Sequence, residues 1–144
     1  MQKKKAETRY VHLSQERGLK SMERKKKVLI ADDIEQIHNL LAMHLSADEF
    51  DIIHAYDGKE TLKLAEEQLP DLIVLDVLMP LVDGRDICKK LKSDPDTKNI
   101  KIVMLTGKSE QHDRIVGLEL GADDYITKPC SMSYLARRIK ALLE

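Results

Sequence analysis

From Val28 onward, short apolar runs alternate with segments whose apolar residues recur every three or four positions. The apolar runs have the length of buried strands, and the periodic segments have the spacing of amphipathic helices. The runs cover residues 28–30, 52–53, 72–75, 102–105 and 125–126, and the periodic segments cover residues 34–45, 62–69, 87–91, 115–120 and 135–142. This pattern predicts successive strand–helix units, repeated five times.

The predicted strands are apolar enough to be buried on both faces, which is typical of a parallel sheet covered by helices. Each intervening segment is long enough for a right-handed crossover between parallel strands. Together these features predict an α/β fold, a doubly wound parallel sheet of five strands. No G-x-G-x-x-G pattern follows the first strand and the chain has no P-loop sequence, so a dinucleotide-binding domain is disfavoured.

Polar side chains stand where the apolar runs end. Asp32 and Asp33 follow the first run, Asp76 follows the third, the fourth ends in Thr106, and Lys128 follows the fifth. Parallel strands would bring them together at one edge, where doubly wound sheets hold their ligands. Clustered carboxylates repel one another unless a cation compensates, and Mg²⁺ suits such a cluster because it binds through one or two carboxylates and bridges to phosphate. The hydroxyl and the ammonium suit an anion.

Two of these residues have ordinary structural explanations when each is taken alone. Asp33 precedes Ile34 and suits the N-cap of the next helix. Asp76 could be a polar strand end. Their joint occurrence with Thr106 and Lys128 favours a site over coincidence.

Charge divides the chain into two parts. Residues 1–27 contain ten Lys and Arg but three Asp and Glu, whereas the remainder contains 14 and 22. We expect residues 1–26 to form a basic, flexible N-terminal extension. Residues 27–144 are expected to form one acidic domain that does not bind nucleic acid directly.

Cysteine usage and hydropathy indicate a reduced, cytoplasmic protein. Cys88 and Cys130 lie far apart and form no C-x-x-C pattern. No apolar stretch approaches the roughly 20 residues of a membrane span, and the lysine-rich start lacks the apolar segment of a secretory signal. The histidines fit no zinc spacing with the cysteines, so His38 and His44 are expected to be ordinary surface residues of the first helix.

Four segments resemble the receiver domain of two-component response regulators, including the chemotaxis-regulator type. They are Val28 to Asp33, Asp71 to Gly84, Leu105 to Gly107 and Gly121 to Pro129. Each is weak alone, but four in the right order and at the family's spacing are specific. The resemblance covers about residues 27–144 and implies the flavodoxin-like strand order 2-1-3-4-5.

By this resemblance, Asp76 is the phosphoacceptor, which attacks the phosphorus of a partner's phosphohistidine. Asp33, Asp76 and the backbone carbonyl of Leu78 would hold Mg²⁺, and Asp32 would act mainly through water. Lys128 would pair with a phosphoryl oxygen, and its peptide bond with the following proline resembles a cis bond of the family.

The resemblance also implies a conformational switch. Thr106 would donate a hydrogen bond to the phosphoryl group, and Gly107 would add room and a backbone N–H. As Thr106 moves, the ring of Tyr125 would turn inward; the alternative is that Tyr125 is simply a half-buried strand residue. The output surface would comprise the fourth helix, the fifth strand and the fifth helix.

The implied protein is a signalling module and not an enzyme, although it assists its own phosphorylation and dephosphorylation. A sensor histidine kinase or a histidine phosphotransfer protein would be its donor, and an effector protein or a linked output domain its target; homodimerisation stays open. One alternative is a receiver-like scaffold that is never phosphorylated. Another is a Mg²⁺-dependent aspartyl phosphatase, which is disfavoured because Leu78 stands where that chemistry wants a second aspartate.

Two further positions depart from or vary within the family pattern. Cys130 stands where an aromatic or apolar residue often follows the Lys-Pro pair, and we expect a packed thiol there. The position two residues after Thr106 is Lys108, whose ammonium would either hold the phosphoryl group or lie in solvent.

Overall fold

The computed structural model describes residues 24–107 and 120–144. Its centre is a parallel sheet of five strands: β1 (Lys26–Ala31), β2 (Phe50–Ala55), β3 (Leu72–Asp76), β6 (Lys101–Thr106) and β7 (Asp124–Thr127). Their order across the sheet is β2-β1-β3-β6-β7. Because β6 and β7 are the fourth and fifth strands of this sheet along the chain, the predicted order 2-1-3-4-5 is confirmed.

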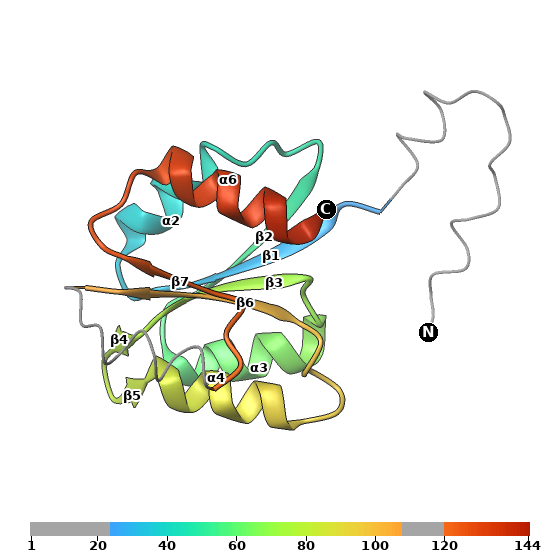
Figure 1. Cartoon of the computed structure of the whole chain (residues 1–144), viewed down its shortest axis with the longest axis vertical. Helices are drawn as coiled ribbons and strands as arrows, with labels where there is room; N and C mark the ends of the chain where they lie inside the picture. The colour runs from blue at the N-terminus through green and yellow to red at the C-terminus, as the bar shows by residue number, and fades with distance from the viewer. Residues whose placement is uncertain (1–23, 108–119) are drawn as a thin grey trace, which may run out of the picture.

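Helices cover both faces of the sheet. They are α2 (Glu35–Ala42), α3 (Gly58–Gln68), α4 (Gly84–Ser93) and α6 (Met132–Leu143). Figure 1 shows α2 and α6 on one face and α3 and α4 on the other, which confirms the doubly wound α/β architecture. The predicted helix containing Ile115 and Leu118 lies outside the described residues.

Each central strand of the sheet contributes side chains to two hydrophobic cores, one on each face, because successive side chains point to opposite faces. On β3, Ile73 and Leu75 belong to the core under α3 and α4, whereas Leu72 and Val74 belong to the core under α2 and α6. All five residues of β3 are buried. Burial on both faces explains why this strand reads as an uninterrupted apolar run.

The first helix differs from its sequence prediction. Ile34 precedes α2 and is 49% exposed, and Leu40 is 39% exposed, although both lie in the segment 34–45 whose apolar residues predict a buried helix face. His38 is fully buried, so the prediction that it is a surface residue is wrong. The inward positions are instead 38, 41 and 45, a spacing of three and four that places His38 above Leu41 and Leu45. His44 is exposed, as predicted.

A small antiparallel hairpin that the apolar pattern did not predict follows β3. Its strands are β4 (Leu78–Met79) and β5 (Val82–Asp83), each of two residues. The chain returns to the end of β3 at Gly84, whose N–H donates to the carbonyl of Val77 at 2.7 Å. A Cβ at Gly84 would lie 2.5 Å from the carbonyl oxygen of Asp76, so only glycine permits this approach. The hairpin is thereby held beside Asp76.

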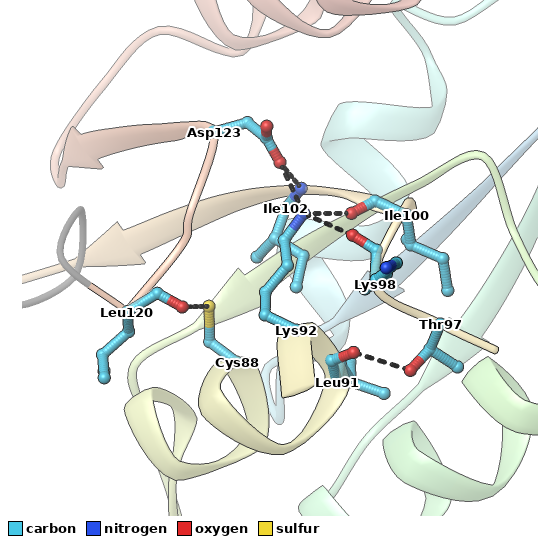
Figure 2. A network of polar contacts seen from close by, with 9 residues as sticks. All are labelled: Cys88, Leu91, Lys92, Thr97, Lys98, Ile100, Ile102, Leu120 and Asp123. Carbon is cyan, nitrogen blue, oxygen red and sulfur yellow. Dashed lines mark hydrogen bonds and ion pairs between the residues drawn. The ribbon is translucent and has the colours of Figure 1, made fainter. Parts of the chain in front are cut away.

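The opposite end of the sheet is tied together by polar contacts between α4 and the strands (Figure 2). The Lys92 ammonium donates to the carbonyls of Ile100 at 2.7 Å and Lys98 at 3.2 Å, and it pairs with Asp123 at 3.1 Å. The same Asp123 oxygen accepts the N–H of Ile102 at 2.8 Å. These contacts hold the starts of β6 and β7 against the end of α4.

Candidate functional site

The strand register brings the predicted site residues to one edge of the sheet. Asp76 on β3 pairs with Leu105 on β6, and Thr106 pairs with Thr127 on β7. One carboxylate oxygen from each of Asp32, Asp33 and Asp76 lies within 4.8 Å of the others. The predicted convergence of these carboxylates at the carboxyl ends of the strands is therefore present in the structure.

Lys128 reaches the carboxylates from the end of β7. Its Nζ lies 3.5 Å from Asp32 Oδ2 and 3.5 Å from Asp76 Oδ1. Its backbone N–H donates to the carbonyl of Thr106 at 2.6 Å, which ties the two strand ends together. The Lys128–Pro129 peptide bond is cis, as the sequence resemblance implied. One ammonium thus lies between two carboxylates of the cluster.

The three aspartates differ in exposure and in local contacts. Asp32 is 1% exposed and Asp76 is 4% exposed, whereas Asp33 is exposed. The N-cap position of α2 is Ile34, with no side-chain cap, so the alternative that Asp33 caps this helix is wrong. The N–H of Ile34 instead donates to Asp32 Oδ1 at 2.9 Å. The buried Asp32 shapes the turn, and Asp33 is the exposed member of the cluster.

Burial and crowding favour the protonated form of Asp76. Burial raises its pKa to about 6, with Asp32 adding to the rise, while Lys128 and the backbone N–H of Leu78 act in the opposite direction. A single ammonium at 3.5 Å therefore does not offset the desolvation and repulsion of this carboxylate. A divalent cation would supply that charge, and clustered carboxylate oxygens are the ligands Mg²⁺ prefers. The donor set fits this ion.

The hairpin presents its main chain to Asp76. The N–H of Leu78 donates to Asp76 Oδ1 at 3.3 Å, while the Leu78 side chain is 68% exposed. The role predicted for the Leu78 carbonyl as a metal ligand stays a prediction. Gly107 directly follows Thr106 and has open space where a side chain would start. Among the described residues, no atom lies within 4 Å of a Cβ built there.

Thr106 and Tyr125 are both buried. Thr106 is 4% exposed at the end of β6, and Tyr125 is 2% exposed within the core under α3 and α4. Tyr125 is therefore fully buried and not half-buried, because its ring packs within this core. The predicted switch role of the two residues stays a prediction.

Two histidines at this site were missed by sequence reasoning. The Nε2 atom of His38 lies 2.8 Å from the carbonyl oxygen of Asp32, and its Nδ1 atom lies 2.7 Å from Nδ1 of His54. The spacing of His38 to Leu41 and Leu45 was a sequence signal for its inward position. The contact with His54 on β2 depends on the tertiary fold.

The cysteines carry no sign of reactivity. Burial raises the pKa of Cys88 to about 11, and it raises the pKa of Cys130, which packs at the edge of the core under α2 and α6. A thiol with a raised pKa is a poor nucleophile near neutral pH. The prediction of a packed thiol at Cys130 is confirmed.

Comparison with known families agrees with the fold. The sequence model of the protein family named response regulator receiver domain matches residues 28–140. The chain therefore belongs to the response regulator receiver domain family, the regulator component of two-component signalling, and the resemblance seen in the sequence is confirmed.

Individual relatives extend this result. The chain is 49% identical over 118 residues to the alkaline phosphatase synthesis transcriptional regulatory protein PhoP of Bacillus subtilis, covering 82% of this chain and 48% of that protein. It is 43% identical over 116 residues to the response regulator PleD of Caulobacter vibrioides, covering 81% and 26%. The chain thus spans less than half the length of these curated relatives.

A solved structure shows the same architecture. The receiver domain of Francisella response regulator 1452 is 34% identical and superposes with a TM-score of 0.75, covering 83% of this chain and 97% of that one.

Within residues 24–107 and 120–144, none of the helices has the length and apolar character required to cross a membrane.

Proposed function

We propose that this chain is a phosphorylation-activated switch whose phosphoacceptor is Asp76. One observation carries the proposal: a buried carboxylate of raised pKa lies with two other carboxylates within 4.8 Å and with the Lys128 ammonium at 3.5 Å. A structural carboxylate normally has enough positive charge beside it to offset its own charge. Asp76 has too little positive charge around it. Such a group is suited to a cation and to a transferred phosphoryl group.

In the proposed reaction, a carboxylate oxygen of Asp76 attacks the phosphorus of a phosphohistidine. The new bond makes an acyl phosphate, the phosphorus–nitrogen bond breaks, and its electron pair returns to the partner's imidazole. Lys128 pairs with a phosphoryl oxygen from its place beside Asp76. Asp33, Asp76 and the Leu78 carbonyl would hold Mg²⁺, with Asp32 acting through water. When bound, Mg²⁺ offsets the negative charge of the phosphoryl group, so catalysis is mainly positioning and electrostatics.

The proposed output is a change in the surface formed by the predicted fourth helix (residues 115–120), β7 and α6. The Thr106 hydroxyl would donate to a phosphoryl oxygen, and the shift would be passed to the buried ring of Tyr125. Inverting a 1:99 population requires phosphorylation to favour the active state by about 5.5 kcal/mol. A smaller bias would produce a graded response.

The donor is inferred to be a sensor histidine kinase or a histidine phosphotransfer protein. The target is an effector protein or a linked output domain, in keeping with relatives about twice this length or more, one of which is a transcriptional regulatory protein. We infer no enzymatic turnover of a separate substrate. Two free cysteines agree with a reducing, cytoplasmic location.

Incubation with acetyl phosphate and Mg²⁺, followed by intact mass spectrometry, tests the proposal. Wild type should gain one phosphate, and Asp76→Asn should gain none. Asp71→Asn is the matched control, because Asp71 lies at the other end of the same strand and should leave the gain intact. Wild type that gains nothing would favour the unphosphorylated scaffold, and free phosphate released in many turnovers would favour the phosphatase.

A further inference from the structure

A continuous chain of hydrogen bonds leads from β2 through α2 to the acidic turn of the site. His54 Nδ1 lies 2.7 Å from His38 Nδ1, and His38 Nε2 lies 2.8 Å from the carbonyl oxygen of Asp32. His38 is fully buried, and its ring stacks on Tyr56 with centroids 4.2 Å apart. Both ring nitrogens of a buried residue are therefore used, and the ring's orientation is held on its face as well.

The chemistry of the acceptor determines where the protons lie. A carbonyl oxygen accepts and never donates, so His38 Nε2 carries the proton that binds Asp32. In a neutral imidazole the other nitrogen, Nδ1, is then an acceptor. The proton in the contact between the rings must come from His54 Nδ1. Burial, followed by the neighbouring His38, lowers the pKa of His54, which favours the neutral form of the His54 ring.

The Asp32 carbonyl is the third of three restraints on the turn between β1 and α2. The N–H of Asp32 donates to the carbonyl of Ala55 at 3.1 Å, and Asp32 Oδ1 accepts the N–H of Ile34 at 2.9 Å. The carbonyl held by His38 belongs to the peptide unit that joins Asp32 to Asp33. Fixing the plane of this peptide fixes the direction in which Asp33, the exposed aspartate of the cluster, leaves the chain.

We propose that His38 is a positioning residue for the metal site: supported by His54, it holds the Asp32–Asp33 peptide in the orientation that brings the Asp33 carboxylate to the ion. This inference rests on the proposed function, because it presumes that the carboxylate cluster binds Mg²⁺. Residues that hold metal ligands in place typically change metal affinity 10- to 100-fold when they are replaced. His38 acts on the backbone of a ligand, so we expect the lower end of this range.

The test is a MgCl₂ titration of the ¹⁵N-labelled full chain, followed through the backbone amides of residues 32–34. His38→Ala should bind Mg²⁺ about tenfold more weakly than wild type, because the Asp32 carbonyl loses its donor. His38→Gln should recover most of the affinity, since the glutamine amide can place an N–H near the Nε2 position. His38→Asn, whose shorter amide cannot, should not recover it. His44→Ala removes an exposed imidazole just beyond the same helix and should change nothing.

A second readout does not depend on the ion. Long-range ¹H–¹⁵N spectra of the imidazoles near neutral pH should show His38 protonated at Nε2 and bare at Nδ1, and His54 protonated at Nδ1. The opposite tautomer of His38 would overturn the inference even if His38→Ala failed to fold. A folded His38→Ala with wild-type Mg²⁺ affinity would overturn it as well. Wild type that binds no Mg²⁺ would overturn the metal site itself, and with it this role of His38.

Discussion

The two ends of strand β3 place an aspartate in opposite surroundings. Asp71, just before the strand, accepts the Lys27 N–H at 2.7 Å and pairs with the Arg24 guanidinium at 2.9 Å. Asp76, at the other end, lies 3.5 Å from the Lys128 ammonium and 3.3 Å from the Leu78 N–H, within a group of carboxylates. The first carboxylate has short contacts of its own, whereas the second shares one ammonium with Asp32.

The same contrast holds for β7. Asp123, before the strand, accepts from the Lys92 ammonium and from the Ile102 N–H (Figure 2). Lys128, after the strand, is the cation that two carboxylates share. Asp71 and Asp123, at the starts of the strands, therefore stabilise the fold, whereas Asp76, at the end of β3, has too little positive charge around it. A bound divalent cation would supply the missing positive charge.

The largest expected effect on stability lies at the strand starts. Asp123→Ala should lower the free energy of unfolding by about 2–3 kcal/mol, because the partly buried Lys92 and the Ile102 N–H both lose a charged partner. Urea denaturation measures the change, and the exposed Asp96→Ala is the control, expected within about 0.5 kcal/mol of wild type. Phosphorylation by acetyl phosphate should persist in both. A loss of phosphorylation in folded Asp123→Ala would break the division between the two ends.

At the strand ends, removing a carboxylate charge should raise the free energy of unfolding and not lower it. The pKa of Asp76 is about 6 in the folded protein against an ordinary value of 3.8, so the folded state holds this proton more tightly. Without Mg²⁺, wild type should therefore lose stability as pH rises from about 4 through 6, whereas Asp76→Asn should not. Above pH 6 we expect Asp76→Asn to be more stable by about 1–2 kcal/mol.

Thermal or urea unfolding in EDTA across this pH range measures the difference. At about pH 4 the two proteins should be nearly equal, because both then carry an uncharged group at this position. Asp71→Asn, with the same change at the other end of β3, should lose stability at neutral pH. Destabilisation by Asp76→Asn at neutral pH would mean that Asp76 is as well paired as Asp71, and the contrast between the two ends of β3 would be wrong.

A smaller effect concerns the β4–β5 hairpin beside Asp76. Hydrolysis of the acyl phosphate needs a water in line with the phosphorus, and the Leu78 side chain offers that water no hydrogen bond. Leu78→Asn should speed dephosphorylation by up to about tenfold, a barrier change of about 1.4 kcal/mol. The decay of phosphoprotein with excess Mg²⁺ and no kinase measures it. Leu81→Asn, an exposed position in the same hairpin, is the control and should decay as wild type does.

The smallest effect is expected where the basic extension meets the sheet. The Arg24 side chain is 54% exposed, so its pair with Asp71 is screened by solvent, and Arg24→Ala should cost no more than about 0.5–1 kcal/mol. Deleting residues 2–23 keeps this pair and should leave Mg²⁺-dependent phosphorylation unchanged. A fall in the rate of phosphorylation on that deletion would show that the extension contributes to the site.

The strand ends were predictable and much of their surroundings was not. Apolar runs buried on both faces mark the strands, and the parallel arrangement then brings Asp32, Asp76 and Lys128 together. The β4–β5 hairpin was missed because strands of two residues carry no periodicity. The contact of His38 with His54 and the pairing of Asp123 with Lys92 join residues 16 and 31 positions apart, which no local pattern reports.

The identity of the phosphoacceptor is the central claim, and chemical mapping tests it most directly. Borohydride reduces an acyl phosphate to an alcohol, which converts the acceptor aspartate to homoserine. After phosphorylation with acetyl phosphate and Mg²⁺ and reduction with borohydride, peptide mass mapping should find homoserine at position 76 alone, and none when Mg²⁺ is replaced by EDTA. Homoserine at position 32, 33 or 71, or no homoserine in a protein that has gained phosphate, would contradict the assignment of Asp76.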